Sequence, residues 1–158
     1  MDLEDTLTGM DAERVVFGGV FAVANRLQRV LDRAMPQVTA KQWWLLVMLS
    51  MFDAPPTLGE LADAANTSHQ NTRQVLDKLA AKGFVTLAPD QRDGRACRVV
   101  ATGKVEEWSK ATGGQAREFM AAMYAGLSPA ELTTIASGLL RIHDTLGCME
   151  HTARTKEK

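Results

Sequence analysis

Apolar side chains recur with helical spacing at both ends of the chain. A first helix is predicted from about Asp11 to Met35, ending at Pro36. A long helix is predicted from about Gly103, weakened midway by Gly113 and Gly114, and a final helix from 129 to about 150. The apolar face of the first helix carries Phe17, Val20, Phe21, Ala24, Leu27 and Leu31.

Polar residues mark further helix starts through the pattern Ser/Thr-x-x-Glu/Gln, in which two side chains satisfy backbone groups of the first turn. The pattern occurs at Thr39–Gln42, Thr57–Glu60, Thr67–Gln70 and Ser128–Glu131. It predicts helices over about 40–52, 58–65 and 68–82, the last ending at Gly83. The helix over 40–52 is apolar almost all round, which predicts burial on every side.

Alternating residues after Gly83 predict a β-hairpin. Phe84 to Leu87 read as one strand, the Asp93-Gly94 dipeptide as part of a turn, and Arg95 to Ala101 as the returning strand. The order from 57 to 101 is therefore helix, turn, helix and hairpin. This is the layout of a winged helix-turn-helix, in a chain that is otherwise mainly α-helical.

Composition narrows the class of protein. The chain has 158 residues, of which 46% are apolar and 23% charged, as in a folded domain with an added assembly layer. Its apolar runs are too short to span a membrane, and the acidic N-terminus does not resemble a secretion signal, so we expect a cytoplasmic protein. We find no enzyme motif and no zinc-ligand spacing, and expect neither catalysis, cofactor nor metal.

Charge is concentrated in the helix over 68–82 and the hairpin. Between Ser68 and Lys104 there are seven Lys or Arg and three Asp, a net of +4, so the rest carries −5 to give the total of −1. This is the electrostatic pattern of a protein that reads duplex DNA. The helix opens with residues able to contact bases and phosphates: Ser68, His69, Gln70, Asn71, Thr72 and Arg73. Val75, Leu76 and Leu79 are expected to pack inward.

These segments resemble the MarR family of bacterial transcriptional regulators. The similarity is carried by Leu58 to Asp63, Ser68 to Arg73, Leu79-x-x-x-Gly83-Phe84-Val85 and, most specifically, Asp90-x-Arg92-Asp93-Gly94-Arg95. The resemblance implies a winged helix-turn-helix flanked by N- and C-terminal dimerisation helices. It divides the chain into 1–36 and 103–150 for dimerisation, 37–102 for DNA binding, and a tail over 151–158.

The resemblance also implies the mode of action: a homodimer that binds an inverted-repeat DNA operator and represses until a small effector releases it. The helix over 68–82 would enter the major groove, and Arg92 and Arg95 the minor groove, braced by Asp93. Asn71 stands where many members carry Thr, and Gly94 where many carry Arg.

The family's effector crevice lies between the dimer layer and the winged domain. Large side chains on the first two helices, Phe17, Phe21, Trp43, Trp44 and Met48, are candidates to line it, although the same spacing favours a plain core role for each of them. A small aromatic molecule is the expected effector. Gly113-Gly114 is a candidate point for changing the distance between the two copies of the helix over 68–82 in the dimer.

Two other functions stay open. The same fold can dock onto another protein instead of DNA, although concentrated positive charge favours DNA. A thiol-based redox regulator would use Cys97 or Cys148, but neither lies near the start of the first helix, where the peroxide-sensing branch of the family keeps its reactive thiol. Both cysteines are expected to be small buried side chains.

Overall fold

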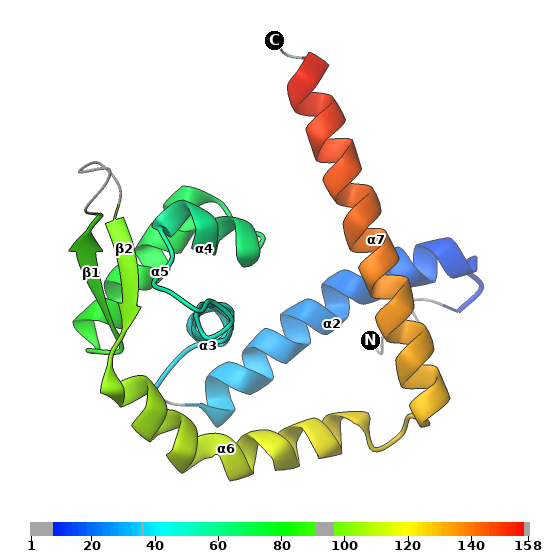
Figure 1. The fold of residues 1–158 in the computed structure, drawn as a ribbon. Helices are drawn as coiled ribbons and strands as arrows, with labels where there is room; N and C mark the ends of the chain where they lie inside the picture. The colour runs from blue at the N-terminus through cyan, green and yellow to red at the C-terminus, as the bar shows by residue number, and fades with distance from the viewer. Residues whose placement is uncertain (1–7, 36, 91–96, 157–158) are drawn as a thin grey trace. The chain divides into compact units, whose positions relative to one another are not determined.

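The computed structural model describes residues 8–35, 37–90 and 97–156, and side chains only to residue 150 and at 152 (Figure 1). Its elements are α2 (Ala12–Ala34), α3 (Ala40–Leu49), α4 (Leu58–Ala64), α5 (His69–Ala81), β1 (Val85–Pro89), β2 (Cys97–Ala101), α6 (Gly103–Tyr124) and α7 (Pro129–Lys156). The predicted fold class, mainly α with a β-hairpin, is confirmed. The chain forms two compact units, 1–108 and 109–158, which we describe separately.

Three of the four predicted helix starts are confirmed by their hydrogen bonds. Reciprocal caps join Thr39 to Gln42, Thr57 to Glu60 and Ser128 to Glu131. The prediction at Thr67 is wrong by one residue.

The N-cap of α5 is Ser68, whose Oγ accepts from the backbone N–H of Asn71 at 3.2 Å. The hydroxyl of Thr67 instead accepts from the side-chain amide of Asn71 at 2.8 Å. Two adjacent hydroxyl residues can each cap a helix, and only the path of the backbone decides between them.

Helix ends differ more from the predictions than helix starts. α3 ends at Leu49 rather than near 52, and the hydroxyl of Ser50 donates to the carbonyl of Val47. α7 continues to Lys156, so the expected end near 150 is wrong. α6 runs through Gly113 and Gly114 as continuous helix. Gly83 ends α5 with φ +76°, the left-handed conformation that glycine adopts without strain.

The buried core of the first unit forms where α3, α4, α5 and the hairpin meet. Its fully buried members include Val38, Leu61, Leu76, Leu79, Phe84, Val85 and Val99. Trp108, at the start of α6, packs edge-on against Phe84 with ring centroids 6.0 Å apart. The prediction that the helix over 40–52 is buried on every side is wrong, because the side chain of Trp44 on α3 is 44% exposed.

Within the described ranges, β1 and β2 pair antiparallel with Val85 opposite Ala101 and Pro89 opposite Cys97. The segment before α4 pairs with the other edge of β2 through a bridge between Thr57 and Arg98, and the N–H of Val99 donates to the carbonyl of Pro56 at 2.8 Å. The part of β2 nearest the hairpin loop is thereby joined to the start of α4. Among the described residues, no helix is long and apolar enough to cross a membrane.

Exposed apolar side chains line one face of α2 and of α7. On α2 the rings of Phe17 and Phe21 lie edge to face, 5.3 Å apart, and Phe17 is 71% exposed. On α7 the exposed set is Ile135, Leu139, Leu140, Ile142, Leu146 and Met149. Apolar faces of this extent are typical of surfaces that another protein surface covers.

Candidate nucleic-acid interface

The solvent-facing side of α5 is polar, and its opposite side is core. Gln70, Arg73, Gln74 and Asp77 are all exposed and follow helical spacing along one face. Gln74 was not predicted as a contact, although its spacing from Gln70 could have indicated it. A polar face of this kind matches a helix that reads base edges.

Thr72 lies on the other side of α5 and is 0% exposed, so its predicted place at the DNA groove is wrong. The reason is its spacing of four and seven residues from Leu76 and Leu79, which places it on the core face of the helix. Its hydroxyl oxygen has no hydrogen-bond partner among the described residues.

The other predicted residues at the start of α5 are exposed, and Ser68, His69 and Asn71 make contacts near the helix start. Ser68 and Asn71 are joined by the N-cap bond described above. The imidazole of His69 lies against α4, where a Cβ at position 59 would approach its Cε1 to 3.1 Å. Gly59 therefore provides the space in which His69 packs.

Arg73 and Asp77 form an ion pair on the exposed face of α5. The Nε of Arg73 donates to Oδ1 of Asp77 at 2.9 Å, one helical turn away. Both side chains are about half exposed. The predicted base-reading arginine is therefore paired with Asp77, one of the three Asp counted in this segment of the sequence.

Arg98 anchors the hairpin near the loop end of its strands. Its guanidinium pairs with the buried carboxylate of Asp90 and donates to the carbonyl of Pro55 at 2.6 Å. In the sequence, Arg98 contributes one of the seven positive charges of this segment, and nothing in the local pattern indicates its contact with Asp90. The predicted wing residues Arg92, Asp93 and Arg95 lie outside the described residues.

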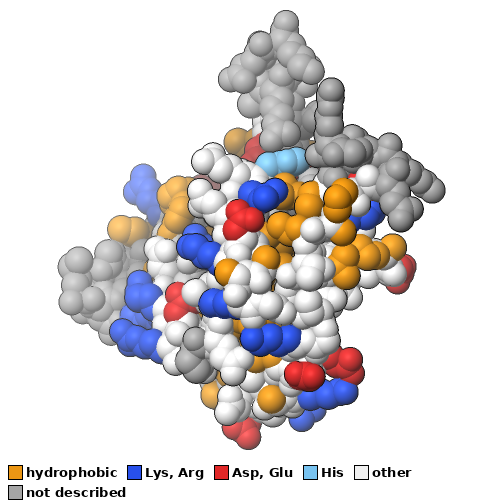
Figure 2. All heavy atoms as spheres, turned by 90° about the vertical axis from the view of Figure 1, so that its left-hand side faces the viewer, with side chains coloured by type: hydrophobic (Ala, Val, Ile, Leu, Met, Phe, Trp, Pro, Cys, Tyr) orange, Lys and Arg blue, Asp and Glu red, His pale blue; other side chains and the backbone are white. Residues whose placement is uncertain are grey.

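Two lysines hold the C-terminal end of α5. The Nζ of Lys82 donates to the carbonyl of Gln37 and to Oε1 of Gln42, each at 2.9 Å. The Nζ of Lys104 donates to the carbonyl of Lys82 at 2.7 Å and lies 4.9 Å from the ring centroid of Phe84. Figure 2 shows Lys and Arg side chains on the side of the molecule that carries the two strands.

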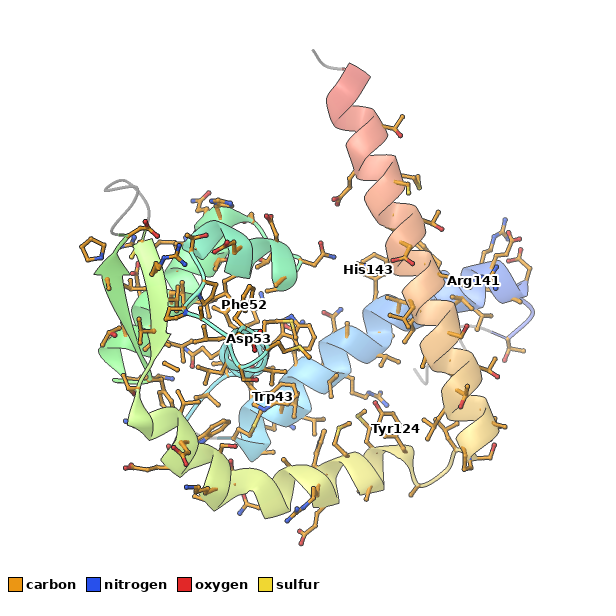
Figure 3. The ribbon with its side chains drawn as sticks, in the orientation of Figure 1. Trp43, Phe52, Asp53, Tyr124, Arg141 and His143 are labelled. Carbon is orange, nitrogen blue, oxygen red and sulfur yellow. The ribbon has the colours of Figure 1, made fainter. Side chains whose placement is uncertain are left out.

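A pocket of about 410 Å³ opens between α2, α3 and the first turns of α5. Of the five predicted effector residues, all described, Trp43 and Trp44 line it, whereas Phe17, Phe21 and Met48 do not. Trp43 lies on α3 beside the end of α2 (Figure 3). The other residues that line the pocket are Ala24, Leu27, Gln28, Leu31, Ala40, Lys41, Leu45, Ala65, Asn66, Thr67, Asn71, Thr72 and Val75.

Cysteine and metal chemistry has little support in the described part of the chain. Cys97 is partly buried on β2 and Cys148 is exposed on α7, so the expected burial is wrong for Cys148. Across residues whose side chains are described, no three His, Cys, Asp or Glu gather as a metal site.

The helix, turn, helix and hairpin of the first unit define a winged helix-turn-helix protein. Residues 37–96 match the model of the MarR family. This match confirms, over these residues, the resemblance seen in the sequence. No curated protein matches the sequence closely enough to count as a relative.

Solved structures share the fold over most of the chain. A MarR protein from Peptoclostridium difficile superposes with a TM-score of 0.76 and 15% identity, covering 88% of this chain and 90% of that one. The MepR–DNA complex of S. aureus gives 0.73 and 18%, with 82% and 97% covered. BpsR of Bordetella bronchiseptica, described as regulated in its DNA binding by 6-hydroxynicotinic acid, gives 0.73 and 19%, with 87% and 96% covered.

Proposed function

We propose that this protein is a DNA-binding transcriptional regulator that acts as a homodimeric repressor. The observation that carries the proposal is the exposed polar face of α5, with Arg73 at its centre, in a MarR-family winged domain. The similar fold of MepR, solved with DNA, supports this use of the domain. A docking module for another protein would not need the net +4 between Ser68 and Lys104.

A homodimer follows from the exposed apolar faces of α2 and α7. Each face is uncovered within its own unit, at a cost in free energy in water, and a second copy offers the same apolar surface in return. Two copies would present two α5 helices to half-sites about one helical turn of DNA apart. The operator would then be an inverted repeat.

The proposed effector site is the pocket beside α5. Trp43, Trp44 and Leu27 would cover an apolar ring, while Lys41 and the hydroxyl of Thr72 could serve an anionic or neutral polar group. The effector class is therefore a small aromatic acid or phenol. BpsR, with its 6-hydroxynicotinic acid, supports a molecule of this kind.

Release of DNA would work through the inner side of α5, because Asn71, Thr72 and Val75 belong both to α5 and to the pocket lining. A ligand that fits best when α5 is displaced would lower operator affinity by a coupling of about 1 to 3 kcal/mol. This route acts on α5 directly, because residues of α5 line the pocket. Gly113 and Gly114, which the sequence suggested as a point of respacing, lie within the continuous helix α6.

DNA binding is tested with the purified protein and its own upstream DNA, titrated between about 50 and 200 mM salt. Arg73→Ala should cost about 1 to 3 kcal/mol and relax preference at one base pair per half-site. Arg92→Ala and Arg95→Ala should weaken binding to all sequences and flatten the salt dependence. Unchanged affinity in all three variants would favour the protein-docking alternative.

The effector site is tested with aromatic acids, phenols and cationic drugs, followed by tryptophan fluorescence and operator release. Trp43→Phe and Trp44→Phe assign the fluorescence change to the pocket. Ligands that quench either residue without changing DNA affinity would reject the proposed regulation. If no ligand binds below about the millimolar range, which is weak for such a site, the pocket is not an effector site.

A further inference from the structure

The ion pair between Arg73 and Asp77 is made through Nε and not through the two terminal nitrogens of the guanidinium. The contact with Oδ1 of Asp77 uses Nε, at 2.9 Å. Bidentate recognition of guanine uses two N–H groups of the guanidinium against O6 and N7. Arg73 can therefore keep its bond to Asp77 while its terminal nitrogens contact a base.

Helix stability gives little reason for an acidic residue at position 77. Exposed pairs one turn apart contribute little, and the order with the acid on the C-terminal side is the less favourable one. On a surface that approaches DNA, a carboxylate also repels phosphates. Asp77 thus costs affinity for DNA in general, and the contact that can offset this is the one with Arg73.

Arginine has a long side chain with many rotamers, and ordering it on binding is costly. A guanidinium already held through Nε loses less freedom when it meets a base, and it presents its donors in a fixed plane. Gln70 and Gln74 flank Arg73 on the same face, but neither carries a negative charge that could hold the guanidinium in place.

We propose that Asp77 is a positioning residue for Arg73, which orients the guanidinium to read a guanine in each operator half-site. The inference rests on the proposed DNA-binding function. It assigns sequence specificity to a pair of residues, with Arg73 touching the base and Asp77 acting through it.

The test begins with an operator that the wild-type protein selects from a random DNA library, followed by affinity measurements on single base-pair variants of it. Arg73→Ala should lose a preference of about 5- to 150-fold for guanine at one position per half-site. Asp77→Asn should lower the preference at that same position by about 2- to 12-fold. Its affinity for unrelated DNA should stay equal or rise, because one negative charge is removed.

Two controls separate positioning from charge and from folding. Asp63→Asn removes an equal charge from the exposed side of α4 and should leave the preference unchanged. Asp77→Glu, which can still pair with Arg73, should restore part of it. The double variant Arg73→Ala with Asp77→Asn should lose no more preference than Arg73→Ala alone, because the two act as one unit.

The outcomes distinguish a failure of the positioning role of Asp77 from a failure of the proposed DNA-binding function. If Asp77→Asn keeps the full preference while Arg73→Ala loses it, the positioning role is wrong and DNA binding stands. If Asp77→Asn changes the preference at a different base pair, Asp77 acts independently of Arg73 and the inference is also wrong. If the wild-type protein selects no sequence, the proposed function fails and the inference fails with it.

Discussion

The Nζ of Lys82 lies 2.9 Å from Oε1 of Gln42, joining the end of α5 to the start of α3 across 40 residues of sequence. The same amide oxygen accepts from the backbone N–H of Thr39 at 3.1 Å and so closes the cap of α3. Gln42 is buried. One side chain therefore completes a helix cap and holds the C-terminal end of α5.

Replacing Gln42 by Ala should lower the free energy of unfolding by about 1 to 3 kcal/mol, because it removes the acceptor of two hydrogen bonds, one of them from the charged Lys82. Urea denaturation measures this. Gln115→Ala, on the exposed side of α6, is the matched control and should change stability by less than about 0.5 kcal/mol. Equal effects of the two substitutions would show that the link between α3 and α5 does not contribute to stability.

Acid should weaken the capping boxes at the starts of α4 and α7. The backbone N–H and the hydroxyl of Thr57 donate to Glu60 and, with a smaller contribution from Arg98, lower the pKa of Glu60 below 4.5. Ser128 lowers the pKa of Glu131 in the same way, first through its hydroxyl and then through its N–H. A carboxyl with a lowered folded-state pKa stabilises the fold above 4.5, and this is lost as pH falls through the lowered value.

Glu60→Gln and Glu131→Gln should therefore flatten the dependence of stability on pH below about 4.5. Glutamine can still close the cap, as Gln42 does, but it has no charge to lose. Urea denaturation across this pH range compares each variant with the wild type. Parallel curves would mean that the caps do not contribute to acid sensitivity.

Thr72→Val should raise the free energy of unfolding by about 1 kcal/mol, because it removes a buried hydroxyl without a partner among the described residues and keeps the shape. Effector affinity should fall and operator affinity should not change, since Thr72 lies on the buried face of α5, opposite the exposed face proposed to contact DNA. Thr72→Ser, which keeps the hydroxyl, is the control for ligand binding. A loss of stability in Thr72→Val would mean that the hydroxyl makes a favourable hydrogen bond.

Charge on the apolar faces should separate the proposed dimer. The wild type should sediment as two chains of 17.2 kDa, and Leu139→Glu and Phe17→Glu as one, with loss of operator binding. Asp144→Asn, an exposed change on α7, should leave the dimer intact. A wild-type species of 17.2 kDa at micromolar concentration would reject the dimer.

Local chemistry made much of this fold readable in the sequence. A cap joins residues three apart, so Thr39 with Gln42 and Thr57 with Glu60 could be recognised without knowing the rest of the fold. Gly83 is likewise a local requirement, since its φ of +76° strains other residues. The helix, turn, helix and hairpin order followed from such signals.

Contacts between distant segments were decided only by the tertiary structure. Sequence spacing cannot show that Lys82 meets Gln42, or that Arg98 joins Asp90 to Pro55, because each contact depends on how separate segments approach. The pocket lies beside Leu27 and Thr72 rather than Phe17 for the same reason. Apolar periodicity identifies the face of a helix that avoids water, whereas the packing of neighbouring helices decides which part of that face becomes core, pocket or exposed surface.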